Sequence, residues 1–286
     1  MIRGLLGRVE VGDGLPVRVI GVINVSPESF YKGSVVTDPR AIAETALRMV
    51  GEGADLLDIG GRSTAPYLPT EVPLDEEVRR VTLAIRAVKD SVDVPISVDT
   101  FRARVAEEAL KLGAEVVNDV TGLRGDSDMV RVIREYEPSL IVCARERVPR
   151  HGSPIERVVG ALRETLQLLT DIGYDLRKVV VDPCIGFFRY GDMPWYIWDL
   201  RVLANLRELR SLGRPIAVGV SRKSFIGVIT GRERPEERLY GSLAMTAVAV
   251  LNGAHVVRTH DVAATRDVVK AIEGYIKYGL QLPPGG

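Results

Sequence analysis

The sequence predicts an α/β fold in which eight parallel strands, each followed by a helix, close into a (β/α)8 TIM barrel. Eight short runs of β-branched and apolar residues recur along the chain, and most are too uniformly apolar for a strand with one wet face. Amphipathic segments of helical length separate these runs, and such alternation is typical of parallel sheets. Eight units within 286 residues match a closed barrel. The alternative is an open doubly wound sheet, but the loop NVSPESF at residues 24–30 lacks its glycine-rich fingerprint.

The predicted strands stop where polar residues begin. In order, they are residues 17–24, 54–60, 94–99, 114–119, 139–144, 178–183, 214–221 and 254–260. In such a barrel the carboxyl ends of all strands meet at one mouth, where the active site lies. The polar residues at or just after these ends are Asn24, Asp58, Arg62, Ser63, Thr64, Asp99, Thr100, Asn118, Asp119, Asp182, Ser221, Arg222, Lys223, Arg258 and His260.

Residues at the segment boundaries support the intervening helices. Residues 38–53 open with Asp38 as an N-cap followed by a proline, and they close on glycine. The predicted helix over residues 101–113 also ends on glycine. Residues 261–279 complete the series with apolar residues at helical spacing.

One further element precedes the first strand. Residues 8–19 predict a short N-terminal β-hairpin that turns at Gly12 to Gly14 and plugs the floor of the barrel. We expect a single domain over residues 1–286, with the barrel at about 19–278 and a frayed tail at 281–286.

The composition is that of a globular protein, with 46% hydrophobic and 27% charged residues and a net charge of zero. This balance argues against nucleic acid or an anionic membrane as a partner. The N-terminal residues lack the long apolar core of a signal peptide, and the two cysteines, Cys143 and Cys184, are too few for a disulfide framework. We therefore expect a cytoplasmic protein. Glutamine and asparagine are scarce, as is typical of thermophile proteins.

Cations follow the last two strands of the predicted barrel, which is the usual place for phosphate binding in this fold. Lys223 supplies a mobile point charge, and Arg258 supplies a fork that can hold two phosphate oxygens. His260 lies two residues beyond Arg258, on the same side of an extended strand. Alternatively, Arg222 and Lys223 belong to a solvated loop with Ser221 as a helix cap. Because the neighbouring strand carries Arg258 and His260, we favour an anion site.

Carboxylates and amides end the earlier strands. Asp99, Asn118 and Asp182 each follow an apolar run, and together they offer the acceptors and donors that suit a pyrimidine-like heterocycle. Alternatively, each of them caps the helix that follows.

Other chemically interesting residues favour a structural role. His255 is expected to be a packed strand residue, and there is no cluster of His and Cys typical of structural zinc. Trp195 and Trp198 are three residues apart on a predicted helix, which indicates core or dimer contacts.

Four segments and their order give a resemblance to a known family. They are GVINVSPESF, GADLLDIGGRSTAP, VPISVDTFRARVAEEALKLGAEVVNDVTGL and VGVSRKSFIG, and a fifth, GAHVVRTHDVAATRDVVKAI, closes the match. Over about residues 19–272 the chain resembles dihydropteroate synthases, the barrel transferases of folate synthesis. The resemblance implies a homodimer.

The resemblance implies a reaction in which a dihydropterin bearing a CH2-pyrophosphate loses pyrophosphate and p-aminobenzoate captures the carbon. It implies that Asp99, Asn118, Asp182 and Lys223 hold the pterin, and that Asp99, Lys223 and Arg258 take part in catalysis. By the same resemblance, Asn24, Arg258 and His260 hold the pyrophosphate with Mg²⁺, for which Asn24 is the metal ligand. Ser63, Thr64, Pro66, Phe187 and Ser221 bound the arylamine.

The chain departs from the family pattern mainly on the arylamine side. Ala65 stands where an arginine is usual, although Arg62 lies nearby. After the sixth strand, Cys184 and Phe188 replace glycines. Side chains added where the backbone normally approaches closely are expected to narrow or reshape the pocket. The fifth strand continues as CARERVPR in place of the usual M-H-M segment.

Three other functions remain open. The chain could join a different pterin or nucleophile, or it could be a pterin-binding methyltransferase, although that reaction leaves the cations unexplained. It could also be a non-catalytic pterin-binding protein with divergent loops.

Overall fold

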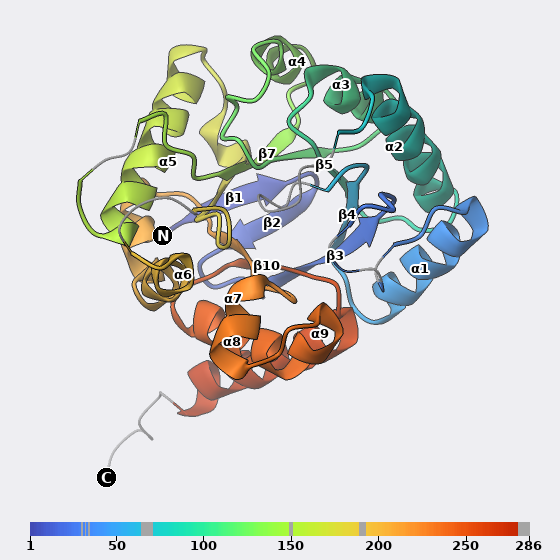
Figure 1. Cartoon of the computed structure of the whole chain (residues 1–286). Coiled ribbons are helices and arrows are strands. Elements are labelled where there is room, and N and C mark those ends of the chain that lie inside the picture. The colour runs from blue at the N-terminus through green and yellow to red at the C-terminus, as the bar shows by residue number, and fades with distance from the viewer. Residues whose placement is uncertain are drawn as a thin grey trace.

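The computed structural model describes residues 1–29, 31, 33, 35–63, 71–148, 151–188 and 193–279; the predicted tail at 281–286 lies outside them. Eight parallel strands form one sheet in the order β8-β7-β6-β5-β4-β3-β10-β9. A further parallel bridge between Val181 and Ile216 brings the two ends of the sheet together. The strands therefore form a barrel (Figure 1), as predicted. Their bounds are β3 Arg18–Asn24, β4 Leu56–Gly60, β5 Ile96–Asp99, β6 Val116–Asp119, β7 Ser139–Cys143, β8 Val179–Asp182, β9 Ala217–Gly219 and β10 Val256–Thr259.

Helices surround the barrel on the outside (Figure 1). Their bounds are α1 Pro39–Gly51, α2 Leu74–Lys89, α3 Ala103–Lys111, α4 Met129–Tyr136, α5 Pro154–Asp171, α6 Trp195–Ala204, α7 Ser224–Thr230, α8 Leu239–Leu251 and α9 Val262–Gly274. The predicted cap of α1 is confirmed, because the Asp38 side chain accepts hydrogen bonds from the backbone N–H groups of Arg40 and Ala41. At α5, Ser153 and Glu156 form a reciprocal capping box.

The N-terminal hairpin consists of β1 Arg3–Leu6 and β2 Val9–Gly12. Its turn is at Gly7 and Arg8, so the predicted turn at Gly12 to Gly14 is wrong. Gly12 instead pairs with Arg3 at the open end of the hairpin. Residues 3–6 are too short and too weakly patterned to predict a strand, yet they supply the partner with which β2 pairs.

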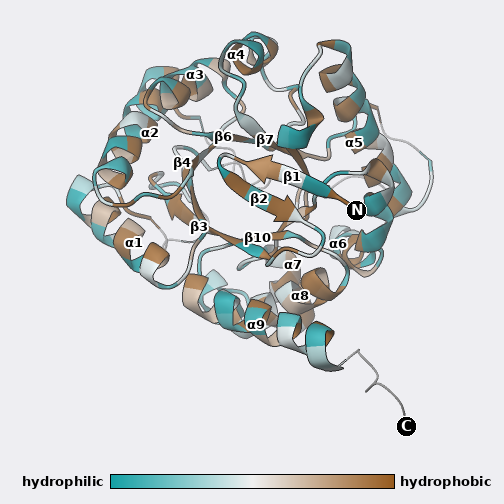
Figure 2. Cartoon of the chain, turned by 180° about the vertical axis from the view of Figure 1, so that it is seen from behind, coloured by the Kyte–Doolittle hydropathy of each residue, from teal (hydrophilic) through white to brown (hydrophobic). Residues whose placement is uncertain are grey.

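The hairpin closes the floor of the barrel, as predicted (Figure 2). Leu6 and Val11 pack on the apolar side chains that the barrel strands direct inward, including Ile20, Val116 and Val180. This apolar plug fills the end of the barrel where the strands begin. The polar side chains inside the barrel therefore lie at the opposite end, where the strands stop. Within the described residues, no helix is long and apolar enough to cross a membrane.

Candidate active site

The strand register brings most of the predicted site residues to one mouth of the barrel. Asn24 lies opposite Gly60, Gly60 opposite Asp99, and Asp99 opposite Asn118. Neighbouring strands are about 4.8 Å apart, so these side chains form a continuous arc at the carboxyl ends.

A buried ion-pair network forms the centre of this arc. Arg258 Nε donates to Asp58 Oδ2 at 2.6 Å, and Arg258 Nη2 donates to Asp99 Oδ2 at 2.8 Å. Asn118 Nδ2 donates to the same Asp58 oxygen at 3.1 Å. Asp58 was recognised from the sequence only as a mouth residue, and its pairing with Arg258 was missed. The one available signal was a carboxylate in the middle of an apolar strand.

The network leaves acceptor capacity unused. Among the described residues, the buried Oδ1 atoms of Asp58 and Asp99 have no hydrogen-bond partner. Burial raises the pKa of Asp99 above its usual range, while Arg258 opposes that rise. Burial alone would lower the pKa of Arg258, but Asp58 and Asp99 outweigh it and keep the guanidinium charged. The unpaired oxygen of Asp99 is suited to accept a hydrogen bond from a ligand N–H.

Lys223 and Asp182 form a second cluster beside this network. Lys223 Nζ donates to the carbonyl oxygen of Ile185 and lies 5.0 Å from the centre of the Phe187 ring. Burial lowers the pKa of Lys223 to about 8, against the opposing charge of Asp182. Burial likewise raises the pKa of Asp182, and Lys223 opposes that rise. The predicted proximity of Lys223 to an acidic strand end is therefore present.

His260 lies among the residues predicted to bind an anion. Its Nδ1 is 3.0 Å from Ser221 Oγ, and its Nε2 is 3.5 Å from the amide nitrogen of Asn24. The ring of Tyr31 meets the imidazole edge to face at 5.3 Å between ring centres. Burial first, and then the positive charge of Arg258, lower the pKa of His260 to about 3, so the imidazole is neutral at pH 7.

Arg222 does not share the environment of Lys223. Its guanidinium donates to both carboxylate oxygens of Asp261, at 2.8 and 2.6 Å, and to the carbonyl oxygens of Pro235 and Glu236. The backbone of Arg222 has φ 58°, a left-handed conformation that turns the chain sharply between its two neighbours. Assigning both cations to one anion site is therefore wrong for Arg222, which ties the end of β9 to the loop after β10.

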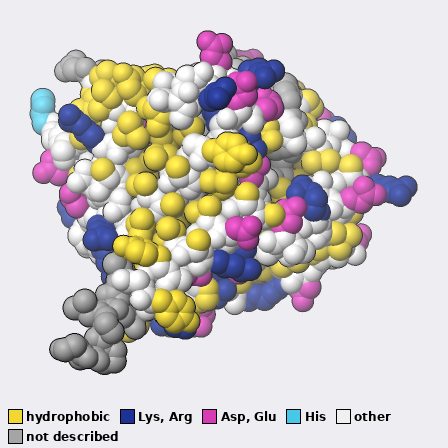
Figure 3. Space-filling view, turned by 90° about the horizontal axis from the view of Figure 1, so that it is seen from below, with side chains coloured by type: hydrophobic (Ala, Val, Ile, Leu, Met, Phe, Trp, Pro, Cys, Tyr) yellow, Lys and Arg dark blue, Asp and Glu magenta, His cyan; other side chains and the backbone are white. Residues whose placement is uncertain are grey.

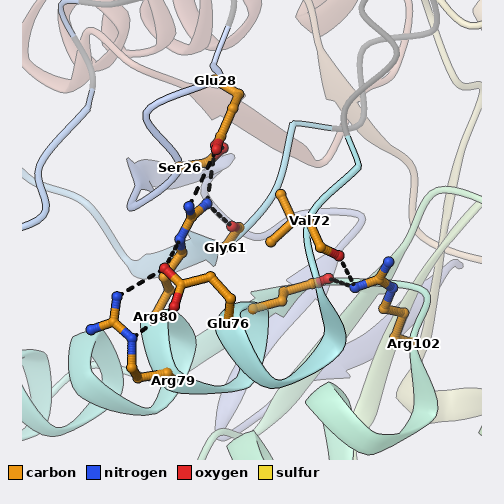
Figure 4. A network of polar contacts seen from close by, with 9 residues as sticks. Ser26, Glu28, Gly61, Val72, Glu76, Arg79, Arg80 and Arg102 are labelled. Atoms are coloured by element: carbon orange, nitrogen blue, oxygen red, sulfur yellow. Dashed lines mark hydrogen bonds and ion pairs between the residues drawn. The ribbon is translucent and has the colours of Figure 1, made fainter.

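Arg80 of α2 holds both the first and the second loop, through Glu28 and the carbonyl oxygen of Gly61 (Figure 4). Arg80 donates to Glu28 at 3.0 Å and to Glu76 at 2.7 Å, and Ser26 donates to Glu28 at 2.6 Å. Although burial acts to raise it, the pKa of Glu28 is lowered to about 2 by Arg80 and Ser26. Ser63 is half-buried at the mouth, whereas the predicted Thr64 and Pro66 lie outside the described residues.

Arg62 has an unusual position in the second loop. Its guanidinium carbon lies 4.5 Å from the centre of the Phe101 ring. The side chain is half-buried and makes no hydrogen bond or ion pair within the described part of the chain. A guanidinium stacked on an aromatic ring keeps its in-plane N–H donors available for a planar anion.

The divergent segments at the ends of β7 and β8, the fifth and sixth barrel strands, pack against each other. Cys143 and Cys184 form a disulfide, which the sequence had not predicted. Cys143 lies opposite Asp182 in the strand register, so cysteines 41 positions apart become neighbours. In the loop beyond β7, Glu146 receives two hydrogen bonds from Arg157, at 2.9 and 2.5 Å.

Two aromatic residues complete this packing. Arg157 stacks at 4.5 Å on the ring of Trp198, which stacks on Phe188 at 5.0 Å between ring centres. Trp198 is buried, so its predicted core role is confirmed. His255 is also buried, as predicted, and its Nδ1 accepts a hydrogen bond from the Ile216 N–H.

In the described ranges, no group of three or more His, Cys, Asp and Glu side chains could hold a metal ion by itself.

Comparison with known proteins agrees with this arrangement. The family model for pterin binding enzymes matches residues 20–260. The dihydropteroate synthase of Clostridium beijerinckii is 33% identical over 258 residues, covering 90% of this chain and 93% of that protein. That of Mycobacterium leprae is 34% identical, covering 93% of this chain and 96% of that protein.

Solved structures give the same result. Dihydropteroate synthase from Clostridium difficile, solved in the presence of pteroic acid, has a TM-score of 0.83 and 36% identity and covers 93% of this chain and 98% of that one. The Xanthomonas albilineans enzyme in complex with 7,8-dihydropteroate has a TM-score of 0.82 and 33% identity, with 98% of this chain and 100% of that one covered. The chain therefore belongs to the dihydropteroate synthase family of pterin-binding enzymes.

Proposed function

We propose that this protein condenses 6-hydroxymethyl-7,8-dihydropterin pyrophosphate with p-aminobenzoate and releases pyrophosphate. The observation that carries the proposal is the placement of two chemically different clusters side by side at one barrel mouth. One cluster, around Asp99, Asn118, Asp182 and Lys223, offers acceptors and a cation for a heterocycle. The other, around Asn24, Ser221, Arg258 and His260, offers donors for a phosphate group.

The pterin is recognised by the first cluster. Asp99 Oδ1, which has no hydrogen-bond partner among the described residues, accepts an N–H of the aminopyrimidine edge, since a ring with adjacent donors matches a carboxylate. The ammonium group of Lys223 has three N–H donors, so it donates to a ring acceptor while it keeps its hydrogen bond to Ile185. Asn118 and Asp182 complete the polar edge.

The reaction needs charge stabilisation rather than a nucleophilic side chain. The lone pair of the amine forms the new C–N bond, the electrons of the C–O bond leave with pyrophosphate, and the amine then loses a proton. Positive charge that develops on the pterin methylene faces the carboxylates Asp99 and Asp182. Negative charge on the leaving group faces Arg258 and the neutral His260.

Mg²⁺ fits this site as a companion of the pyrophosphate. The ion prefers oxygen ligands, keeps several waters, and is often held by one or two protein groups plus substrate phosphates. The carboxamide of Asn24 supplies such an oxygen on the side facing Gly60, where an added Cβ would lie 3.3 Å from it. When bound, the ion would neutralise part of the charge on the leaving group.

The family resemblance assigns the arylamine to Ser63, Phe187 and Ser221, together with Thr64 and Pro66, which lie outside the described residues. Arg62 takes the place of the usual arginine at position 65, because its in-plane donors make no hydrogen bond to any described residue and its stacking on Phe101 fixes the guanidinium plane. The carboxylate of p-aminobenzoate is its ligand in this proposal.

The family resemblance also favours a homodimer, and we place its interface on α7 and α8. Hydrophobic side chains gather on the face that carries these helices (Figure 3), and Val228, Ile229 and Tyr240 are exposed there. An apolar surface of this kind is typical of an interface between subunits. Light scattering after size exclusion should give about twice the mass of one chain, and Val228→Asp with Ile229→Asp should halve it.

The test of function is pyrophosphate release from the dihydropterin pyrophosphate with Mg²⁺, with and without p-aminobenzoate, at moderate and elevated temperature. Amine-dependent release with a coupled product supports the synthase. Pterin binding without amine-dependent release would instead favour another nucleophile or a non-catalytic pterin-binding protein. Methyl transfer from a reduced pterin to a corrinoid protein, without pyrophosphate release, would favour a methyltransferase.

A further inference from the structure

The disulfide lies next to Asp182, one of the residues proposed to bind the pterin. Cys143 is the last residue of β7, and Cys184 comes two residues after the end of β8, with 5.1 Å between their Cα atoms. Both cysteines are buried. The disulfide therefore links the end of one barrel strand to the loop that leaves the next.

Cys184 occupies a backbone conformation that favours glycine. Its φ is 65°, in the left-handed region that side chains with a Cβ adopt at a cost of about 1–3 kcal/mol. Such a residue persists only where the surrounding structure fixes the backbone. At Cys184 the disulfide to Cys143 is one such constraint.

The tethered loop makes direct contacts with two of the residues proposed to bind the pterin, Asp182 and Lys223. The backbone N–H of Cys184 donates to Asp182 Oδ1 at 2.6 Å, which sets the orientation of that carboxylate. The next carbonyl, of Ile185, accepts the hydrogen bond from Lys223 Nζ. An added Cβ at Gly186 would lie 3.2 Å from Lys223 Cδ, so the loop backbone packs against the lysine stem.

A second contact holds the far side of the same loop. The N–H of Gly186 donates to Asp199 Oδ1 of α6 at 2.8 Å. The loop is therefore held between the disulfide on one side and α6 on the other, with Asp182 and Lys223 bonded to the backbone between them.

We propose that the Cys143–Cys184 disulfide is a positioning element for pterin binding: by fixing the loop after β8 it holds Asp182 and Lys223 in their ligand-binding orientations. This inference rests on the proposed function, because it assigns those two residues to the pterin. Cleaving the disulfide should release the loop and weaken pterin binding, while the anion-binding cluster around His260 lies on other strands and should be unaffected.

The experiment compares three proteins by calorimetric titration with 6-hydroxymethyl-7,8-dihydropterin, which lacks the leaving group and cannot turn over. They are the oxidised wild type, the double variant Cys143→Ser/Cys184→Ser, and the double variant Cys143→Ala/Cys184→Gly, in which glycine tolerates the left-handed backbone. Loss of one charged hydrogen bond corresponds to a roughly tenfold weaker Kd for the pterin. We expect that change in both variants, and in wild type treated with a phosphine reductant once thiol titration shows two free cysteines.

Two internal controls separate positioning from general stability. The inhibition constant of pyrophosphate should stay within about twofold of that of the oxidised wild type in both variants and in the reduced wild type, since its cluster does not depend on the loop. In both variants the pH midpoint of pterin binding should move upward from about 8, because a released Lys223 regains water. A role in stability alone would lower the melting temperature and leave both the pterin Kd and its pH midpoint unchanged.

The outcomes are distinguishable. An unchanged pterin Kd in folded protein with both cysteines reduced or replaced would overturn the positioning role, and the glycine variant answers this even where the serine variant does not fold. Absence of pterin binding by the oxidised wild type would instead contradict the proposed function itself.

Discussion

Arg258→Met removes the cation that holds two buried carboxylates at the mouth of the barrel. Arg258 makes two charge-assisted hydrogen bonds, at 2.6 Å to Asp58 and 2.8 Å to Asp99, and bonds of this kind each contribute about 1.5–3 kcal/mol. Removing one partner of a buried ion pair destabilises a protein by about 3–5 kcal/mol, because the remaining charge is left uncompensated. We therefore expect the free energy of unfolding, measured in urea at pH 7, to fall by about 3–5 kcal/mol.

The pH dependence supplies a second check on the same variant. Burial already raises the pKa of Asp99, and without Arg258 nothing of comparable strength opposes that rise. A carboxyl group whose pKa is higher in the folded than in the unfolded state binds more protons when folded, so its contribution to stability falls as the pH rises. The deficit of Arg258→Met relative to wild type should therefore shrink as the pH is lowered from 7 toward 5.

A double-mutant cycle and a matched control complete the test. Asp58→Asn keeps an oxygen that can accept from Asn118, and adding it to Arg258→Met should recover part of the lost stability. Arg62→Met removes an arginine of the same size from the same mouth that has no ion pair among the described residues, and it should change stability by no more than about 0.5 kcal/mol. A loss below about 1 kcal/mol for Arg258→Met, or no recovery in the double variant, would refute the reasoning.

Three further outcomes are expected. Because the pKa of Lys223 is about 8, pterin affinity measured by calorimetric titration should fall as the pH is raised through that value, and Lys223→Arg should remove the fall. A pterin affinity of the wild type that does not change with pH would contradict the assignment of Lys223 to the pterin. Arg62→Ala should raise the KM for p-aminobenzoate about tenfold while the pterin Kd stays constant, and an unchanged KM would exclude Arg62 from the arylamine site. Glu146→Gln removes the carboxylate that pairs with the buried Arg157 and should lower the free energy of unfolding in urea by about 3 kcal/mol. The double variant Glu146→Gln/Arg157→Met should lose less stability than the single variant, and an equal loss in both would argue against the ion pair.

Much of the fold was predictable because it depends on local pattern. Eight apolar runs alternate with amphipathic helices, and a chain that alternates in this way has few ways to bury all of its strands. The hairpin was predicted at the right end of the barrel with the wrong turn, since the pairing of β1 with β2 depends on four residues whose own pattern is weak.

The candidate site was predictable as a set of positions. Parallel strands place all their carboxyl ends at one mouth, so Asp99, Asn118, Asp182 and Arg258 could be assigned to a common region from their place at strand ends. Their individual partners could not be assigned in the same way. Arg222 and Lys223 are adjacent in sequence, yet the left-handed backbone at Arg222 sends one to Asp261 and the other to Ile185.

By itself, then, the sequence determined the barrel, the mouth where polar side chains collect, and the chemical character of its two sides, because these follow from periodicity and from the order of residues along each strand. Only the tertiary structure decided which charges meet. The pairing of Arg258 with Asp58 spans 200 positions, and the Cys143–Cys184 disulfide joins the end of β7 to the loop after β8, which the register of those two strands brings together. Such contacts depend on distances of a few ångströms between distant segments, and strand register and barrel closure set those distances.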